Sequence, residues 1–180
     1  MKKKYDKIVL AGFKGSGKSS VGKQLAEKCG FAFVDIDAVI EAAHADGGRK
    51  SNVRAIFKKH GREYFLTMEG KALKTTARMK GAVISLGGAS PLNAAFSKAL
   101  FKNALFVYLK AKRGVLFARI MEKGIPPFFD REDPRRAFNA LYRQRTPVYK
   151  KIADITVENS GARTPGEVAA RIMKKMEGNQ

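Results

Sequence analysis

A glycine-rich turn between an apolar run and an amphipathic run constrains the fold of this chain most. Residues Gly12-Phe-Lys-Gly-Ser-Gly-Lys-Ser19 match the pattern GxxxxGK[ST]. They follow Lys7–Ala11, which we expect to form a strand, and run into Lys18–Cys29, which we expect to form a helix. Glycines let backbone N–H groups turn toward an anion, and the helix N-terminus adds its positive dipole. The order strand, turn, helix is the context in which this pattern binds phosphate.

The pattern predicts a P-loop that binds a nucleoside triphosphate together with Mg²⁺. Lys18 is expected to reach the β- and γ-phosphates, and Ser19 is expected to ligate Mg²⁺. The alternative is a glycine-rich turn that only looks like a P-loop, and the flanking strand and helix disfavour it. The residues expected to hold the nucleotide lie in or directly after the turn: Gly15, Ser16, Gly17, Lys18, Ser19 and Ser20.

Short apolar runs alternate with longer amphipathic runs along the chain. The expected strands are Lys7–Ala11, Phe31–Asp35, Ala82–Leu86, Ala104–Leu109 and Asp154–Glu158. The expected helices are Lys18–Cys29, Asp37–His44, Asn52–His60, Glu63–Met79, Leu92–Phe101, Arg113–Lys123, Asp133–Lys151 and Pro165–Met176. This alternation predicts an α/β fold, with a parallel sheet covered by helices on both faces. The length of 180 residues fits a single domain over residues 1–180.

Charge and composition narrow the classes of function. Lysine and arginine number 36 and Asp and Glu 16, so the formal charge is +20. The basic residues are spread over several segments, and no basic-aromatic motif of the RNA-binding kind occurs. We therefore expect a solvated basic surface with an anion-binding cleft, and do not expect nucleic acid as the partner.

The sequence also predicts a cytoplasmic protein without a membrane partner. Cys29 is the only cysteine, so no internal disulfide can form and a reducing compartment is expected. No apolar run approaches the roughly 18 residues that a membrane span needs. The first ten residues lack the apolar stretch of a signal peptide.

Further motifs follow the P-loop and extend over nearly the whole chain. In chain order they are Asp35-Ile-Asp37, Ile56-Phe57, Gly61–Glu69, Ser85–Ala89, Pro127-Phe-Phe, Arg145–Asp154 and Arg163-x-Pro165-Gly166. Together they resemble the Asp-x-Asp, IF…GExxFRxxE, SLGGG, RPLL, RxPxYxxxAD and RxP motifs of the shikimate kinase family. Without the resemblance, an Asp at position 37 is equally typical of a helix N-cap.

The resemblance implies a fold and an activity. The fold would be the three-layer P-loop kinase fold, with a five-stranded parallel sheet in the order 2-3-1-4-5. The family transfers the γ-phosphoryl group of ATP to the 3-hydroxyl of shikimate, in aromatic amino-acid biosynthesis. By the same resemblance, a helical region at about 37–65 would bind the acceptor, a lid at about 122–135 would close over it, and the protein would be a monomer.

The resemblance also implies roles for residues outside the P-loop. Asp35 would help to order the Mg²⁺ shell, and Asp37 would hold the acceptor hydroxyl and take its proton. Gly87 and Gly88 would offer backbone N–H groups to the acid, and Arg145 would pair with its carboxylate. Such a set supplies the positioning and charge neutralisation that phosphoryl transfer needs. Three residues would flank adenine: Arg119, Arg163 and Pro165.

The chain departs from the family pattern at three positions. Leu66 stands where the family has an arginine that grips the carboxylate of shikimate. Pro126 stands where the family has the arginine that opens its lid motif, and Ala89 replaces the third glycine of SLGGG. Arg62, four residues before Leu66, is one candidate to replace the first arginine. The candidates to replace the lid arginine follow the two prolines: Arg131, Arg135 and Arg136.

These departures leave two alternatives to shikimate phosphorylation. One is a related kinase that phosphorylates another small polyol or sugar acid. The other is a degenerate P-loop domain that binds ATP and, through its charge, RNA or an acidic partner.

Overall fold

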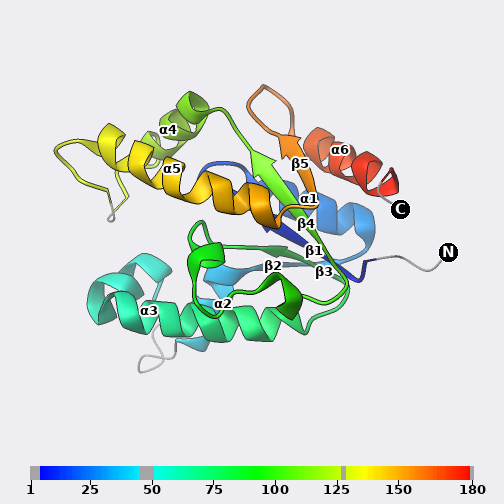
Figure 1. Cartoon of the computed structure of the whole chain (residues 1–180), viewed down its shortest axis with the longest axis horizontal. Helices are drawn as coiled ribbons and strands as arrows, with labels where there is room; N and C mark the ends of the chain where they lie inside the picture. The colour runs from blue at the N-terminus through cyan, green and yellow to red at the C-terminus, as the bar shows by residue number, and fades with distance from the viewer. Residues whose placement is uncertain (1–4, 45–50, 127–128, 179–180) are drawn as a thin grey trace.

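The structure is a computed structural model, and it describes residues 5–44, 51–126 and 129–178 (Figure 1). Its centre is a parallel sheet in the order β2-β3-β1-β4-β5, the order that the family resemblance implied. The strands are β1 (Lys7–Ala11), β2 (Ala32–Asp35), β3 (Ala82–Ser85), β4 (Ala104–Lys110) and β5 (Ile155–Glu158). In the register of the three central strands, Lys7 of β1 lies opposite Ala82 of β3 and Ala104 of β4.

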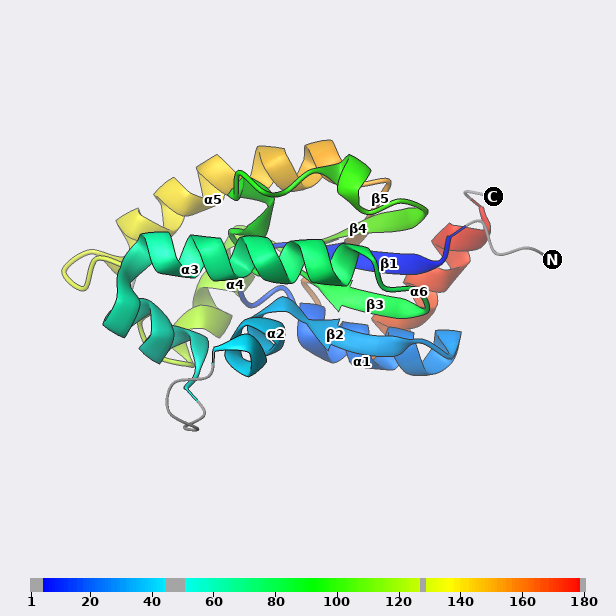
Figure 2. The same ribbon diagram turned by 90° about the horizontal axis from the view of Figure 1, so that it is seen from below.

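Helices cover both faces of the sheet (Figures 1 and 2). They are α1 (Lys18–Cys29), α2 (Ile36–Ala43), α3 (Val53–Ala77), α4 (Arg113–Met121), α5 (Pro134–Ile152) and α6 (Pro165–Glu177). One face packs against α1 and α6, which also contact each other, and the other face packs against α3 and α5. The three-layer α/β architecture predicted from the alternation of elements is confirmed.

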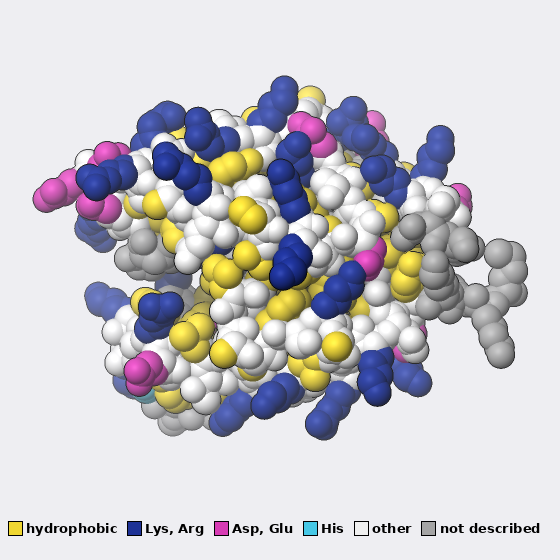
Figure 3. Space-filling view, in the orientation of Figure 1, with side chains coloured by type: hydrophobic (Ala, Val, Ile, Leu, Met, Phe, Trp, Pro, Cys, Tyr) yellow, Lys and Arg dark blue, Asp and Glu magenta, His cyan; other side chains and the backbone are white. Residues whose placement is uncertain are grey.

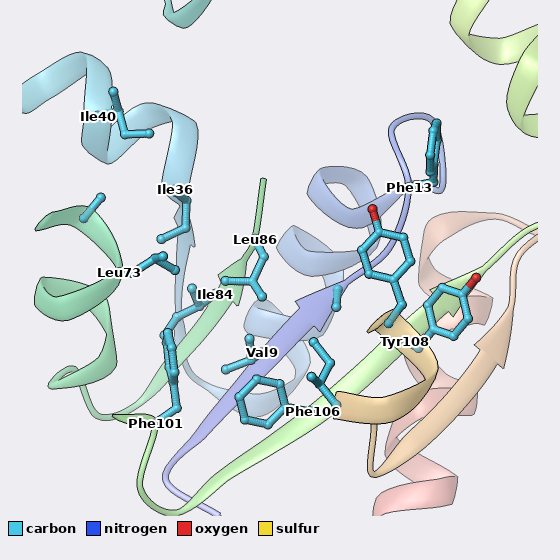
Figure 4. Close-up of a cluster of buried hydrophobic side chains, with 14 of the residues drawn as sticks. Val9, Phe13, Ile36, Ile40, Leu73, Ile84, Leu86, Phe101, Phe106 and Tyr108 are labelled. Carbon is cyan, nitrogen blue, oxygen red and sulfur yellow. The ribbon is translucent and has the colours of Figure 1, made fainter. Parts of the chain in front are cut away.

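The central strands are buried on both faces, so each sends alternate side chains into two separate cores. Val9, Ile84 and Phe106 face α3 and α5, where they join residues such as Leu73 (Figure 4). Their neighbours along the strands, such as Leu10, enter the second core beneath α1 and α6. This explains why the strand sequences are nearly continuous apolar runs.

Local sequence signals account for several helix ends. Gly30 ends α1 in the left-handed conformation, with φ 66°, and its N–H reaches the carbonyls of Ala26 and Glu27. Thr164 and Glu167 form a reciprocal capping box at the start of α6, whose first residue is Pro165. These signals place the loops that precede α6 and follow α1.

The structure corrects one predicted helix and shows how two others meet. Leu92–Phe101 is not a helix: one short 3-10 turn, Ser90–Leu92, ends at its first residue, and another, Lys98–Leu100, lies near its last. Asn93 explains the break, because its side chain accepts the N–H of Ala95 and donates to Glu69, in competition with a helical backbone. The two helices predicted on either side of residue 61 are confirmed: α3 consists of two helices that meet at a sharp kink at Gly61, where φ is 80°.

Candidate active site

The predicted site motifs meet at the carboxyl edge of the sheet. In a parallel sheet every strand ends at this edge, and ligands bind in the crevice between neighbouring loops. The P-loop follows β1, Asp35 ends β2, and Gly87 follows β3 closely. Asp35 lies opposite Ser85 in the register of β2 and β3, so the second and third motifs are neighbours in space.

The P-loop has the backbone conformation that its glycines predict. Gly15 and Gly17 have φ values of 82° and 92°, which side chains other than glycine rarely adopt. The ammonium of Lys18 folds across the loop and donates to the carbonyls of Gly12, at 2.9 Å, and Phe13, at 3.2 Å. The loop therefore encloses its own lysine at the N-terminus of α1.

Lys18 and Asp37 have shifted pKa values in this environment. Burial lowers the pKa of Lys18 to about 8, although the carboxylates of Asp37 and Asp35 oppose the shift. Burial also raises the pKa of Asp37 to about 6, helped by the negative charge of Asp35 and opposed by Lys18. Perturbed groups of opposite charge that face each other in a crevice are typical of a catalytic site.

Asp35 and Ser19 form the candidate metal-binding pair. The Ser19 hydroxyl donates to Oδ2 of Asp35 over 2.9 Å, and Oδ1 of Asp35 accepts the N–H of Asp37 over 3.1 Å. The residue that caps α2 is therefore Asp35, which leaves the carboxylate of Asp37 available for another purpose. In the described part of the chain no group of three or more His, Cys, Asp or Glu could hold a metal ion. A hydroxyl and a carboxylate fit Mg²⁺, which keeps several waters and phosphate oxygens among its ligands.

The turn at Gly87 and Gly88 lies between Asp37 on one side and Arg145 and the P-loop on the other. A Cβ atom on Gly87 would lie 3.4 Å from Oδ1 of Asp37 and 2.8 Å from Oγ of Ser90. A Cβ atom on Gly88 would lie 3.4 Å from Nη1 of Arg145. Because neither position carries a side chain, the backbone of this turn lies close to the Asp37 carboxylate at Gly87 and close to the Arg145 guanidinium at Gly88.

Helix α5 holds Arg145 in this position. Its guanidinium lies 5.6 Å from the centre of the Phe13 ring, a cation–π contact between α5 and the P-loop. One turn further along α5, the buried Tyr149 donates its hydroxyl to the carbonyl of Gly88. The loop after β3 and the arginine are thus held by the same helix. Figure 4 shows Phe13 on the loop beyond the end of β1.

Two buried polar residues support the site, and the sequence reasoning assigned neither a role. Glu69 accepts the Ser90 hydroxyl, at 2.7 Å, and the Asn93 amide, at 2.9 Å, so it fixes the loop that carries Gly87. Glu69 lies in one of the matched motifs, so the resemblance could have indicated it. Asn159 follows β5 in a segment without a motif, and only the tertiary structure shows that its side chain reaches the P-loop.

Asn159 and Arg119 brace the nucleotide side of the P-loop. The amide of Asn159 donates to the carbonyl of Ser16 over 2.9 Å. Arg119 of α4 donates to the carbonyls of Gly15, at 3.2 Å, and Asn159, at 3.1 Å. Arg163 is exposed in the loop before α6, and Pro165 is exposed at the start of that helix.

Comparison with known proteins agrees with this geometry. The family model described as shikimate kinase matches residues 14–177. The chain belongs to the shikimate kinase family. It is 38% identical over 170 residues to a shikimate kinase of Thermodesulfovibrio yellowstonii, which covers 94% of each chain. It is 36% identical over 167 residues to a shikimate kinase of Caldanaerobacter subterraneus subsp. tengcongensis, which covers 93% of this chain and 94% of that one.

Solved shikimate kinases have the same fold. The shikimate kinase from Acinetobacter baumannii in complex with shikimate aligns with a TM-score of 0.87 and 26% identity, over 99% of this chain and 96% of that one. The enzyme from Aquifex aeolicus aligns with a TM-score of 0.74 and 28% identity, over 96% and 97%. Like the family, this chain uses ATP as the phosphoryl donor and shikimate as the acceptor. Among the residues the structure describes, no helix has the length and apolarity to span a membrane.

The positions that depart from the family pattern are also placed by the structure. Leu66 is half-buried in α3, and its carbonyl accepts the Asn93 amide over 2.9 Å. Pro126 is buried, whereas Pro127 and Phe128 lie outside the described residues. Arg62 is exposed, four residues before Leu66.

The three candidates for a lid arginine are also exposed. Arg131 precedes α5, and Arg136 is in its first turn. The guanidinium of Arg135 lies 4.6 Å from the centre of the Phe117 ring, over α4. That contact fixes Arg135 against the helix that precedes the lid region.

Proposed function

We propose that this shikimate kinase transfers the γ-phosphoryl group of ATP specifically to the 3-hydroxyl of shikimate, as a step of aromatic amino-acid biosynthesis. One observation carries the proposal: the turn at Gly87 and Gly88 lies against both the Asp37 carboxylate and the Arg145 guanidinium, beside a P-loop lysine. A hydroxyl that is to be phosphorylated needs a nearby proton acceptor, and the carboxylate of an acidic substrate is bound best by a cationic side chain.

The P-loop would bind and polarise the triphosphate. Backbone N–H groups from Gly15 to Ser20 and the dipole of α1 would receive the β- and γ-phosphates. The Lys18 ammonium would move from the carbonyls of the loop to phosphate oxygens. The negative charge of the phosphate would add to that of Asp37 and Asp35 and raise the pKa of Lys18 above about 8. Ser19 and Asp35 would hold Mg²⁺, which supplies charge neutralisation to the phosphates when bound.

Asp37 would orient the acceptor hydroxyl and accept its proton. With a pKa raised to about 6, its carboxylate is ionised at neutral pH yet basic enough to take a proton during transfer. Gly88 would present its backbone to the acid, and Arg145 would pair with the carboxylate. The planar guanidinium suits a carboxylate because it can donate two parallel hydrogen bonds.

Arg119, Arg163 and Pro165 would form the adenine end of the nucleotide site. The support for this is the bracing of Arg119 between Gly15 and Asn159, which places α4 beside the loop that leads to α6. Residues 37–65 would contact the acceptor, and residues 122–135 would close over it. A single chain supplies each of these groups, which supports a monomer, and a single free cysteine fits a cytoplasmic enzyme.

One specific observation favours a second candidate acceptor. Leu66 is apolar and half-buried at the position where the family carries an arginine, so an acceptor that does not need this second cation, such as another polyol or sugar acid, is the second candidate. The distribution of charge gives less support to a nucleic-acid partner. Figure 3 shows Lys and Arg side chains spread over one face of the molecule, over several elements, rather than gathered in one patch.

A coupled assay of ADP release with Mg-ATP, with and without shikimate, tests the proposal. Turnover that depends on shikimate, with shikimate 3-phosphate identified by mass and NMR, is the expected result. Nucleotide binding without such turnover would refute it, and a panel of polyol and sugar acids would then identify the acceptor. Steeply salt-dependent binding to RNA would instead support a non-catalytic role.

A further inference from the structure

The turn after β3 contains two consecutive glycines, so an acceptor site built on it needs contacts that hold its conformation. Glycine populates more backbone conformations than any other residue, and a Gly-Gly turn therefore loses much entropy when it becomes ordered. The carbonyl of Gly87 is held within the turn, where it accepts the N–H of Ser90 over 3.1 Å. The carbonyl of Gly88 is held by a different element, because it accepts the hydroxyl of Tyr149 in α5.

Three groups from two elements surround Gly88. They are listed by distance from the place where a Cβ atom on Gly88 would sit: Nη1 of Arg145 at 3.4 Å, the backbone nitrogen of Lys14 at 3.7 Å and the hydroxyl oxygen of Tyr149 at 3.8 Å. Arg145 and Tyr149 are four residues apart in α5, so they lie on the same face of that helix. The hydroxyl that holds Gly88 and the guanidinium assigned to the acceptor's carboxylate therefore meet at one glycine.

The hydroxyl of Tyr149 is a donor that is protected from solvent and keeps its proton. Tyr149 is 1% exposed. Burial raises the pKa of Tyr149 well above its usual range, although the positive charge of Arg145 opposes the rise, so the hydroxyl stays protonated at neutral pH. Its hydrogen bond to the Gly88 carbonyl fixes the plane of the peptide that joins Gly88 to Ala89. The bond therefore orients the turn whose backbone N–H groups we assign to the acceptor.

The ring of Tyr149 has a role that is separate from that of its hydroxyl. It packs against the ring of Tyr108 in β4, with 5.4 Å between the ring centres, in the core between the sheet and α5. A phenylalanine would supply this packing equally well. The hydroxyl is therefore the part of the side chain that serves the acceptor site.

We propose that Tyr149 is a positioning residue for the acceptor: its hydroxyl holds the turn at Gly88 against Arg145, so that backbone and guanidinium bind the acceptor's carboxylate together. The assignment rests on the proposed function, because it takes the turn and Arg145 as the groups that bind the acid. Preorganisation of this kind reduces the entropy lost on binding, so it raises affinity without a further contact to the ligand. Loss of the hydroxyl should weaken binding of the acid and leave the chemical step unaffected.

Steady-state kinetics of Tyr149→Phe test this assignment, because phenylalanine keeps the ring and removes the hydroxyl. We expect the KM for shikimate to rise about three- to thirtyfold, as for the loss of one hydrogen bond beside a bound charge. The kcat and the KM for ATP should change less than about threefold. Tyr108→Phe removes the hydroxyl of the neighbouring tyrosine, which is 2% exposed, and as the matched control it should leave the KM for shikimate within about threefold of wild type. An unchanged KM for shikimate in Tyr149→Phe, or an equal rise in the KM for ATP, would overturn the assignment.

A double-mutant cycle with Arg145→Lys separates joint positioning from a general loosening of the fold. Arg145→Lys removes the guanidinium nitrogen that lies beside Gly88 and keeps a positive charge. Because the two groups are proposed to act together, Tyr149→Phe should lower kcat/KM for shikimate by a much smaller factor in the Arg145→Lys protein than in the wild type. Effects that simply multiply in the double variant would show two independent contributions and would overturn joint positioning.

The outcomes distinguish this inference from the proposed function. Wild-type protein that phosphorylates shikimate while Tyr149→Phe keeps the wild-type KM retains the function and loses only the inference. Wild-type protein that neither binds nor phosphorylates shikimate overturns both, and calorimetric titration of shikimate into the wild-type protein detects that case without any variant.

Discussion

Asp37 gives the sharpest test of the site, because its role in the reaction should reduce the stability of the free protein. Burial and Asp35 raise its pKa from 3.8 to about 6, against the attraction of Lys18. A rise of about two units corresponds to about 3 kcal/mol, and solvent screening of a partly accessible carboxylate reduces this to about 1–3 kcal/mol. Asp37→Asn should therefore abolish phosphoryl transfer and at the same time stabilise the free protein at pH 7.5 by about 1–3 kcal/mol.

The dependence on pH identifies the cause of that stabilisation. A carboxyl group whose pKa is raised on folding favours the native state only while it is protonated. The penalty is therefore absent below about pH 4, grows between pH 4 and 6, and is complete above pH 6. Urea unfolding of the wild-type and Asp37→Asn proteins should show the full difference at pH 7.5 and about a third of it at pH 4.5.

A matched control excludes a general effect of removing negative charge from a very basic protein. Glu63→Gln removes an exposed carboxylate from α3 and should leave the free energy of unfolding nearly unchanged at both pH values. The reasoning is refuted if Asp37→Asn is less stable than wild type at pH 7.5, or if its stabilisation is the same at pH 4.5.

Further predictions concern the groups around Asp37. The kcat/KM for shikimate should fall about tenfold per pH unit below about pH 6, as Asp37 becomes protonated in the free enzyme, and a flat profile down to pH 5 would contradict its role as base. Gly87→Ala places a methyl group 2.8 Å from Oγ of Ser90 and 3.2 Å from Oε1 of Glu69, so kcat/KM measured in the coupled assay should fall at least tenfold. Asn159→Ala leaves the carbonyl of Ser16 without its 2.9 Å donor, and should cost about 1–3 kcal/mol in thermal unfolding and raise the KM for ATP more than that for shikimate. Ser19→Ala should raise the Mg²⁺ concentration needed for half-maximal turnover, which a magnesium titration at fixed ATP measures.

Much of the fold was predictable because its signals are local. Each strand is a short run of apolar residues, and most boundaries differ from the prediction by one or two residues, as with Ile36–Ala43 for the predicted Asp37–His44. The break near residue 61 was also predictable from a glycine in a polar segment, although the two helices remain joined through its kink. The segment 92–101 was predicted wrongly, because the side chain of Asn93 bonds to α3, which no local pattern reveals.

The residues of the candidate site likewise include some that local sequence predicts and others that only tertiary contacts reveal. The P-loop is predictable because it follows a strand directly and keeps a fixed spacing within its motif, whereas Asp35 and Asp37 were indicated by the resemblance to the family. The bracing of the P-loop by Asn159 was not predictable, because 143 residues separate its side chain from the Ser16 carbonyl. The proximity of Lys14 to Gly88 also depends on the pairing of β1 with β3, which brings two loops together from distant parts of the chain.

The sequence by itself therefore determined most of the elements and the phosphate-binding turn. These depend on backbone conformation and on residue chemistry over a few neighbouring positions. Only the tertiary structure decided how the motifs face one another, which residue caps α2, and which side chains brace the P-loop. Packing of the strands into one order brings their carboxyl ends to a single edge, and the side chains that meet there are specified by contacts across the whole chain.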